Sequence, residues 1–346
     1  MNNSDSENSY KLAQYQDKRT DGSVRCKLCP HVCLLQDGEV GICHARQNTG
    51  GTLYTLAYGN PCSVSIDPIE KKPLFHFRPG AAILSLATVG CNFHCLNCQN
   101  WQISQAFPDD FGSYRLSPKE VVETALSRNV KLIAFTYTEP TIFYEYMYDI
   151  AVLARKNGIK TVMVSNGFIN PQPLSDLCPY LDAANVDLKC FDNAAYRQLT
   201  GGSLHPVMET LKTLKKNHVW LEITNLLIPG FNDDEKMIRE MCKWLIDKGF
   251  SDTPLHFSRF FPTYKLNDTP PTPEKRLFKA KEIAEETGIR YVYIGNVSHT
   301  NGENTFCPAC KNLLVERKGF SVTKNRIAGG KCSFCGEEIA GDWLID

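Results

Sequence analysis

The chain has 346 residues and carries 38 basic and 38 acidic side chains, so its formal net charge is zero. This balance argues against a surface that binds nucleic acid or anionic membrane through its overall charge, although it still allows a local basic patch. No apolar run approaches the ~18 residues of a membrane span. The polar N-terminus lacks the apolar core of a signal peptide, so we expect a cytoplasmic protein that does not bind membranes.

The 15 cysteines are the unusual feature of the composition. In a long chain without an export signal we expect them to be reduced, and closely spaced reduced cysteines indicate metal ligands. Three groups stand out: Cys26, Cys29, Cys33 and Cys43; then Cys91, Cys95 and Cys98; then Cys307, Cys310, Cys332 and Cys335. Four isolated cysteines are expected to be small packed hydrophobic side chains, namely Cys62, Cys178, Cys190 and Cys242.

The N-terminal part divides into two segments. Residues 1–22 show no apolar periodicity and are expected to form a flexible tail, whereas 23–79 form a cysteine-rich element. The first cysteine group has the spacing C-x2-C-x3-C-x9-C, which suits either zinc or a second [4Fe–4S] cluster. His31 and His44 could replace a cysteine ligand, but we expect both to be polar neighbours.

Residues 80–300 alternate apolar, β-rich runs with amphipathic helical patterns. Strands are predicted at 81–89, 132–138, 161–167, 183–190, 220–229, 254–261 and 291–297. Helices are predicted at 118–129, 143–158, 206–217, 234–249 and 273–288. Three of these helical patterns end in a glycine, where a helix commonly stops: Gly158, Gly249 and Gly288.

This alternation predicts an α/β fold with parallel strands covered by helices, either an open doubly wound sheet or a barrel. The glycine-rich phosphate turn of a dinucleotide-binding sheet is missing after the first strand, where Gly90 and Cys91 stand instead. In both architectures chemistry takes place at the carboxyl ends of the strands. Polar residues at those ends are therefore the candidate site.

Cys91, Cys95 and Cys98 follow the first predicted strand with the spacing C-x3-C-x2-C. A [4Fe–4S] cluster normally has four cysteine ligands, so three would leave one iron free to bind a cofactor or substrate. Two alternatives stay open. One is a zinc site completed by His94 or His76, and the other is a cluster that only carries electrons.

The triplet after the first strand of a βα repeat resembles the radical S-adenosylmethionine (SAM) superfamily, over about residues 80–300. The resemblance implies a partial (βα)6 TIM-like barrel in which SAM binds the open iron through its amino and carboxylate groups. It implies that an electron, from a donor such as ferredoxin or flavodoxin, cleaves SAM to methionine and a 5′-deoxyadenosyl radical. That radical would then abstract hydrogen from a substrate.

The resemblance assigns residues at the later strand ends to SAM. The segment 137–140, Tyr-Thr-Glu-Pro, matches the Glu-Pro half of a Gly-Gly-Glu-Pro motif that contacts the SAM amino group. The segment 165–167, Ser-Asn-Gly, is similar to the Thr-Asn-Gly beside the ribose in pyruvate formate-lyase activating enzymes. Asn97 stands where many members place an aromatic residue near the adenine, so Phe93 or Trp101 could take that role. The implied SAM residues are Phe93, Thr138, Glu139, Ser165, Asn166, Asp187, Lys189 and His256.

Residues 301–346 contain two C-x2-C pairs separated by 21 residues, the pattern of a four-cysteine zinc ribbon. Zinc would replace a core that ~40 residues cannot build alone. An auxiliary iron–sulfur cluster or a rubredoxin-like iron are alternatives. Basic residues between the pairs could form a patch that docks RNA or protein. They are Lys311, Arg317, Lys318, Lys324, Arg326 and Lys331.

The whole arrangement resembles one subgroup, the radical SAM enzyme of the AmmeMemoRadiSam system, which is related to the activating enzymes. Besides the cysteine groups, the matching stretches are 66–80 (IDPIEKKPLFHFRPG), 256–262 (HFSRFFP) and 335–343 (CGEEIAGDW). This resemblance implies a Memo-family and an AMMECR-family protein as partners. The stretch 66–80 is either a surface connector or a segment that brings Lys72 and His76 to the barrel mouth, where they contact SAM or substrate.

The leading interpretation is therefore a radical SAM enzyme with an unidentified substrate. A glycyl-radical-enzyme activating enzyme is the alternative, and a non-catalytic iron–sulfur electron carrier is a more remote one. The connection 298–306 is short, so we expect the zinc-ribbon-like tail near the carboxyl rim of the barrel, where a partner would deliver the substrate. In the other view the ribbon only caps the barrel.

Overall fold

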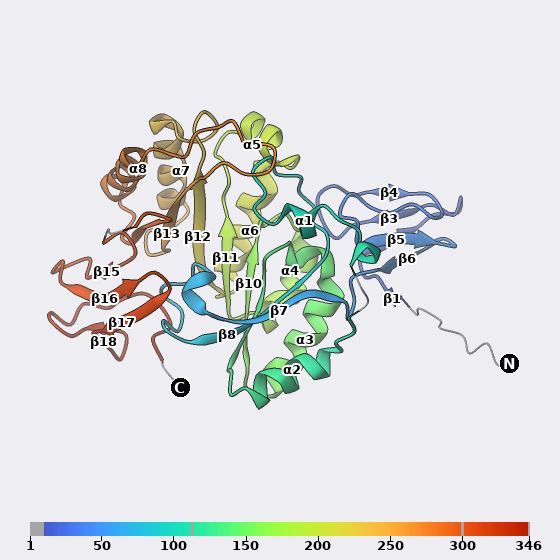
Figure 1. Cartoon of the computed structure of the whole chain (residues 1–346), viewed down its shortest axis with the longest axis horizontal. Helices are drawn as coiled ribbons and strands as arrows, with labels where there is room; N and C mark the ends of the chain where they lie inside the picture. The colour runs from blue at the N-terminus through green and yellow to red at the C-terminus, as the bar shows by residue number, and fades with distance from the viewer. Residues whose placement is uncertain (1–9, 112–113, 299–300, 345–346) are drawn as a thin grey trace.

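The fold is built on an eight-stranded sheet with the order β14-β13-β12-β11-β10-β9-β8-β7 (Figure 1). The computed structural model describes residues 10–111, 114–298 and 301–344. Strands β8 to β14 are all parallel to one another. Their bounds are Ala82–Thr88, Leu132–Phe135, Lys160–Ser165, Ala183–Asp187, Trp220–Leu227, Leu255–Arg259 and Val292–Gly295. The seven predicted strands and the α/β barrel-like fold are confirmed.

Helices connect the parallel strands and cover the outer face of the sheet (Figure 1). The eight α-helices of the described residues are α1 Trp101–Ser104, α2 Pro118–Ser127, α3 Tyr144–Lys156, α4 Pro171–Leu177, α5 Asn193–Thr200, α6 Leu204–Lys216, α7 Glu235–Asp247 and α8 Glu274–Thr287. Six βα units thus run from β8 to α8, and β14 adds a seventh parallel strand. The five predicted helices are present, whereas α1, α4 and α5 were not predicted.

Local sequence explains where these helices begin and end. Ser117 caps α2 by accepting a hydrogen bond from the Glu120 amide, and the Glu120 carboxylate accepts one from the Ser117 amide in return. Pro118 occupies the first helical position, where its missing N–H costs nothing. Gly288 ends α8 with a left-handed φ of 110° that other residues rarely adopt.

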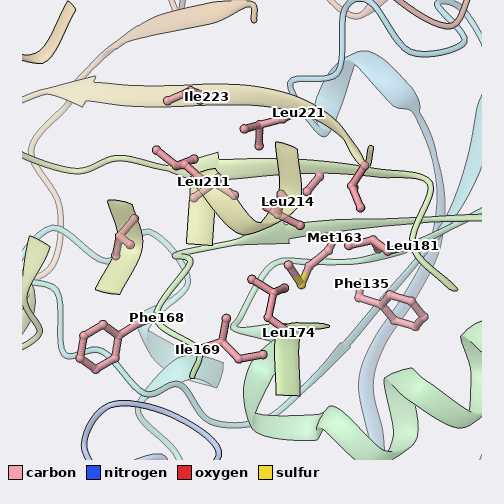
Figure 2. Close-up of a cluster of buried hydrophobic side chains, with 14 of the residues drawn as sticks. Phe135, Met163, Phe168, Ile169, Leu174, Leu181, Leu211, Leu214, Leu221 and Ile223 are labelled. Carbon is pink, nitrogen blue, oxygen red and sulfur yellow. The ribbon is translucent and has the colours of Figure 1, made fainter. Parts of the chain in front are cut away.

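The main core fills the space between the sheet and its helices. Figure 2 shows Phe135, Met163 and Ile223 of the strands facing Leu174 of α4 and Leu211 of α6. A second cluster lies on the opposite face of the strands, near their amino ends, where Ile69, Leu74 and Phe77 pack against Ile83, Leu132, Val162 and Ala183. The segment around residues 69–77 therefore closes the amino-terminal end of the barrel.

The N-terminal element consists of small antiparallel sheets. Their order is β1-β6-β5 and β2-β3-β4, and the bounds are β1 Lys11–Leu12, β2 Gln16–Lys18, β3 Val24–Cys26, β4 Leu34–Leu35, β5 Arg46–Thr49 and β6 Thr52–Thr55. Residues 11–18 were expected to lie in a flexible tail, but β1 pairs with β6 and β2 pairs with β3. Strands of two or three residues are too short to show an apolar periodicity in the sequence, so they could not be predicted. Residues 1–9 of that expected tail lie outside the described residues.

Strand β7 (Pro61–Pro68) was not predicted. It pairs antiparallel with β8 over its whole length and forms the edge of the central sheet. The expected boundary at residues 79/80 therefore separates two hydrogen-bonded strands.

The C-terminal segment forms two small antiparallel sheets with the orders β15-β16-β17 and β18-β19. Their bounds are β15 Thr305–Phe306, β16 Leu313–Lys318, β17 Ser321–Asn325, β18 Ile327–Ala328 and β19 Lys331–Cys332. Val322 lies against Gly80, and Phe77 forms a β-bridge with Asp342. Both contacts are at the amino-terminal end of the barrel, just before β8.

The expectation that this ribbon lies at the carboxyl rim is therefore wrong. After β14 the chain turns back, so that the Ile294 amide donates to the Gly302 carbonyl at 2.9 Å. Since an extended chain spans ~3.3–3.6 Å per residue, even a short connection can run back past a four-residue strand. None of the helices in the described part of the chain has the length and hydrophobicity that crossing a lipid bilayer requires.

Candidate functional site

The loop that carries Cys91, Cys95 and Cys98 follows β8 at the carboxyl end of the barrel. It is fixed to the end of α5, because the His94 and Leu96 amides donate to the Thr200 and Leu199 carbonyls, each at 2.9 Å. The loop therefore has a defined position over the strand ends.

The three thiols of this loop lie close enough to influence one another. Burial raises the pKa of the Cys91 thiol well above its usual value, and Glu139 and Cys95 raise it further. Burial raises the pKa of Cys95 to about 11, although the Lys189 ammonium lowers it. The Cys98 Sγ lies 3.1 Å from the Ser104 hydroxyl. Because metals bind thiolates, the positively charged iron–sulfur core of a bound cluster would stabilise the thiolate charge that burial otherwise disfavours.

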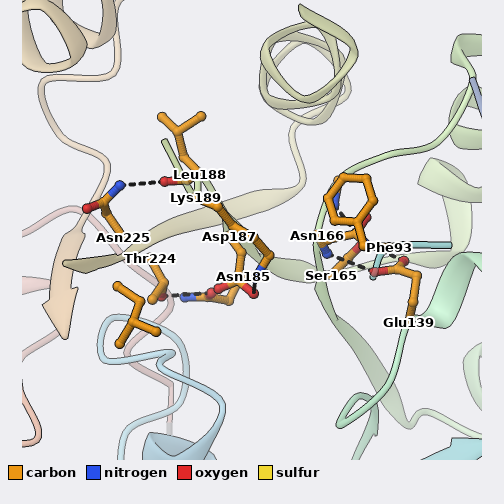
Figure 3. Close-up of polar contacts among 12 residues, drawn as sticks. Phe93, Glu139, Ser165, Asn166, Asn185, Asp187, Leu188, Lys189, Thr224 and Asn225 are labelled. Atoms are coloured by element: carbon orange, nitrogen blue, oxygen red, sulfur yellow. Dashed lines mark hydrogen bonds and ion pairs between the residues drawn. The ribbon is translucent and has the colours of Figure 1, made fainter. Parts of the chain in front are cut away.

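Glu139 joins the ends of β9 and β10. Its buried carboxylate accepts hydrogen bonds from the Ser165 hydroxyl and the Asn166 amide, both at 2.8 Å (Figure 3). Burial raises the pKa of Glu139, which these donors counteract. The Asn166 side chain in turn donates to Asn92 at 2.8 Å, next to Cys91. The three predicted residues thus hold the cysteine loop to the strand ends.

Tyr137 and Thr138 stand where the Gly-Gly-Glu-Pro motif has glycines. Tyr137 has a φ of 65°, the left-handed conformation that glycine adopts most easily. The tyrosine is held there because its hydroxyl bonds Asp67 and Ser65, while its carbonyl accepts from Asn100 at 2.6 Å. The Thr138 hydroxyl donates to the Thr88 carbonyl at 2.7 Å. Side-chain contacts thus hold Tyr137 in this left-handed conformation.

Asp187 and Lys189 lie at the end of β11, beside the cysteine loop. Their side chains form an ion pair of 2.9 Å and stay partly exposed, 34% and 21% respectively (Figure 3). Burial alone would lower the pKa of Lys189, but Asp187 and the neighbouring Cys95 raise it overall. A fixed cation and a fixed carboxylate thus stand next to the three thiols, as recognition of an amino acid requires.

Inside the barrel, His256 of β13 pairs with Glu222 of β12. Their Nε2 and Oε2 atoms are 2.7 Å apart, and both side chains are buried. Glu222 also accepts the Phe75 and His76 amides at 2.9 and 2.7 Å. Sequence reasoning missed Glu222, although a charged residue within the apolar strand 220–227 is a signal for a buried polar contact.

The two aromatic candidates for the adenine differ in exposure. Phe93 is only 1% exposed and fills the space beside Gly202, which has no room for a Cβ. Trp101 is 41% exposed and stacks on Tyr264 with the rings 5.3 Å apart. Trp101 is thus the aromatic side chain that a ligand can reach.

Comparisons with known proteins agree with this site. The family model of the radical SAM superfamily matches residues 85–244, which run from β8 through α7 and include the cysteine triplet and the strand-end residues up to Lys189. The chain belongs to the radical SAM superfamily. Its similarity to activating enzymes of this superfamily identifies it as an enzyme.

The relatives of this radical SAM enzyme cover different parts of it. It is 47% identical to an uncharacterized protein of Methanocaldococcus jannaschii over 330 residues, 94% of this chain and 98% of the relative. It is 24% identical to pyruvate formate-lyase 1-activating enzyme of Escherichia coli K12 over 218 residues, 59% of this chain and 89% of the relative. Among solved structures, Streptococcus suis SuiB bound to SAM shares the fold, with a TM-score of 0.50, 13% identity, and coverage of 69% of this chain and 56% of SuiB.

Lys72 and His76 bond residues outside the cysteine loop of the radical SAM enzyme. Lys72 is buried, with its Nζ 2.7 Å from Asp67 and 4.3 Å from the centre of the Tyr137 ring. His76 is buried against the C-terminal segment, where its Nδ1 donates to the Ala340 carbonyl at 2.6 Å. Burial lowers the pKa of His76 to about 4, so its ring is neutral. The structure does not bring His76 to the barrel mouth, because 69–77 pack at the opposite end.

The C-terminal quartet can hold a single metal ion. The sulfurs of Cys307, Cys310, Cys332 and Cys335 all lie within 4.8 Å of one another, and no other set of His, Cys, Asp and Glu ligand atoms in the described ranges does so. One residue of the expected basic patch is lost, because Arg317 is buried under the ribbon with its guanidinium 4.2 Å from the centre of the Phe75 ring. Arg317 therefore anchors the ribbon to the barrel.

Proposed function

We propose that this enzyme cleaves SAM reductively at a [4Fe–4S] cluster held by Cys91, Cys95 and Cys98. When bound, the cluster and SAM supply a 5′-deoxyadenosyl radical that abstracts hydrogen from the substrate. The observation that carries the proposal is the Asp187–Lys189 ion pair beside Cys95. Three thiols leave one iron for the amino acid end of SAM, and this pair stands where it can bind the carboxylate and ammonium of that end.

The other strand-end residues position this pocket. Glu139, Ser165 and Asn166 fix the ends of β9 and β10, and the backbone at Thr138 follows the left-handed Tyr137. His256 lies deeper in the barrel on Glu222, where it would contact SAM or substrate from below. Trp101, backed by Tyr264, is the surface on which we place the adenine.

The substrate is carried by a protein partner in this proposal. The resemblance to the AmmeMemoRadiSam subgroup covers nearly the whole chain and supports a Memo-family and an AMMECR-family protein as partners. All 15 cysteines are free of disulfides, which supports a reducing, cytoplasmic location where ferredoxin or flavodoxin can donate electrons. The C-terminal quartet is assigned to zinc, because its sulfurs are compact enough for one ion.

A partner experiment tests this proposal. The reconstituted enzyme is incubated anaerobically with SAM and dithionite, alone and with each candidate partner, and 5′-deoxyadenosine is quantified. We expect cleavage in both cases and a product that forms only with a partner. If neither partner changes the rate or the product, the partner assignment fails while the SAM chemistry stands.

A second candidate is a glycyl-radical-enzyme activating enzyme. The similarity to pyruvate formate-lyase 1-activating enzyme over 218 residues favours it. It predicts a glycyl radical signal in the electron paramagnetic resonance (EPR) spectrum of a protein partner. A non-catalytic electron carrier would instead leave SAM intact.

A further inference from the structure

The N-terminal cysteine group lines one pocket beside the active-site loop. Cys26, Cys29, Cys33 and Cys43 surround it, and it is completed by Asn92 of the active-site loop and by Thr141 of the short 3-10 helix Pro140–Phe143 that follows β9. The pocket thus lies between the N-terminal element and the carboxyl ends of the strands.

The sulfurs of this group are arranged more widely than those of the C-terminal quartet. Gly41 lies beside two of them, because its Cβ position would be 3.7 Å from the Cys43 sulfur and 3.9 Å from the Cys33 sulfur. Within the part of the chain that the structure describes, three or more ligand atoms come within 4.8 Å of one another at the C-terminal quartet alone. A zinc ion needs such compactness, since four sulfurs stand ~2.3 Å from one centre, whereas a four-iron cube holds its cysteines farther apart.

The spacing of the cysteines also favours a four-iron cluster over a zinc ion. The zinc-ribbon pattern has two C-x2-C pairs, as the C-terminal segment does. The N-terminal group has three cysteines in one run, 26 to 33, followed by one at position 43. A run of three with a remote fourth is a pattern by which [4Fe–4S] clusters are bound.

Two buried residues that line the pocket each have one donor without a protein partner among the described residues. Arg46 is 1% exposed, its Nη2 pairs with the Glu145 carboxylate and its Nη1 reaches the Cys26 sulfur at 3.7 Å, whereas its Nε has no hydrogen-bond partner in that part of the chain. The Thr141 hydroxyl, also buried, has none either within the same ranges. Unsatisfied buried donors are costly, and both can donate to the sulfurs of an anionic cluster.

The pocket touches the active-site loop directly. Gly90, which precedes Cys91, packs against the carbonyl group of Cys43 so closely that a Cβ would not fit. Asn92, which follows Cys91, lines the pocket and bonds Asn166 at 2.8 Å. One residue on either side of the first active-site cysteine is thus in contact with the N-terminal cysteine group.

We propose that Cys26, Cys29, Cys33 and Cys43 hold a second [4Fe–4S] cluster that passes electrons to the active-site cluster. One electron moves from a ferredoxin- or flavodoxin-class donor to this cluster, reducing it from the 2+ to the 1+ state. The electron then moves on to the cluster at Cys91, Cys95 and Cys98, which returns the second cluster to 2+. No atom or proton is transferred. The electron transfer rests on the proposed function, whereas the binding site does not.

Iron counting on the full chain tests the site. After anaerobic reconstitution, we expect about eight iron per wild-type chain and about four in a Cys91→Ala/Cys95→Ala/Cys98→Ala variant, with one zinc in each. Adding Cys29→Ala and Cys33→Ala to that variant should remove the remaining iron and its EPR signal. As a control, adding Cys62→Ala, at an isolated cysteine, to the same triple variant should leave its iron and its EPR signal unchanged. The wild-type count needs no substitution, so about four iron per chain would refute the second cluster even if a variant fails to fold.

Three results would overturn the site. These are about four iron in the wild type, a second zinc per chain, or iron that persists after Cys29 and Cys33 are replaced. The last result would place the cluster in the C-terminal quartet.

The relay is tested with a Cys29→Ala/Cys33→Ala variant whose fold is checked by circular dichroism. Cleavage of SAM driven by reduced flavodoxin should fall at least tenfold, while cleavage driven by dithionite, which reaches the active-site cluster directly, should be unchanged. Equal rates with flavodoxin in variant and wild type would refute the relay. If the wild type cleaves no SAM with either reductant, the relay fails together with the proposed function, and the iron count alone decides the site.

Discussion

Gly90 lies against the carbonyl group of Cys43, with no space for a side chain between them. Gly90 also has a φ of 105°, outside the range that other residues adopt without strain. Two cysteine groups that are far apart in the sequence thus share one close backbone contact. The contact explains why a glycine precedes the first active-site cysteine.

Replacing Gly90 should therefore destabilise the protein. Gly90→Ala combines the strain of a positive φ, roughly 1–3 kcal/mol, with a clash against backbone that cannot move aside. Gly158→Ala is the matched control, because Gly158 has a φ of 69° but nothing within 4 Å of its Cβ position. We expect a clearly larger loss of Tm for Gly90→Ala, together with iron loss on reconstitution. Equal losses of Tm would show that the contact is not tight.

Lys189 should contribute directly to SAM binding. A charge-assisted hydrogen bond contributes roughly 1.5–3 kcal/mol, so Lys189→Ala should weaken binding about ten- to a hundredfold. Lys212→Ala is the control, since Lys212 forms an exposed ion pair with Glu209 on α6. Calorimetric titration of the reconstituted enzyme with SAM measures both. An unchanged Kd in the Lys189 variant would remove this residue from the site.

Glu222 should stabilise the barrel in a pH-dependent way. Burial would raise its pKa, but His256 and the Phe75 amide hold the pKa below its usual value. A carboxyl whose pKa is lowered on folding adds stability above its unfolded pKa of about 4.5, and this stability is lost as the pH falls through the folded value. Glu222→Gln should cost about 3–5 kcal/mol at pH 7 and less at pH 3.

The exposed Glu209 provides the comparison for Glu222. Glu209→Gln should change the Tm little at any pH, because an exposed ion pair contributes about 0–1 kcal/mol. Thermal unfolding between pH 3 and 7 measures both variants. A loss of Tm for Glu222→Gln that does not depend on pH would contradict the assigned charge.

The C-terminal quartet should hold zinc and support the barrel from its amino-terminal end. Cys307→Ala should remove one zinc per chain and lower the Tm, because the ribbon packs on Phe75 and Tyr293. The iron at Cys91 should stay, since the ribbon contacts the opposite end of the barrel. Metal analysis of the full chain checks this. Iron with a charge-transfer band in place of zinc would make the ribbon a redox centre.

The parallel strands and the long helices could be predicted because their apolar periodicity is local. β7 could not, since an edge strand with Cys62 and Ser65 on it is defined by its partner β8 rather than by its own pattern. The ribbon was misplaced because a connection of this length permits either end of the barrel. The left-handed conformation of Tyr137 is held by contacts with Asp67 that only the folded chain brings together.

Within the site, the cysteine triplet could be predicted from its spacing after the first strand, whereas Asp187 and Lys189 were assigned through the resemblance to the activating enzymes. Glu222 could not be assigned, because its partners His256 and Phe75 come from separate segments. The burial of Phe93 depends on Gly202, more than a hundred residues later in the chain. Long-range packing of this kind leaves no local sequence pattern.

The central claim is that the three cysteines of the loop after β8 support reductive cleavage of SAM. The most direct measurement is the amount of 5′-deoxyadenosine formed in a single anaerobic turnover with dithionite, compared between the wild type and a Cys91→Ala/Cys95→Ala/Cys98→Ala variant. We predict about one equivalent for the wild type and none for the variant, whose Tm shows that it is folded. 5′-Deoxyadenosine from the folded variant, or none from the fully reconstituted wild type, would contradict the account.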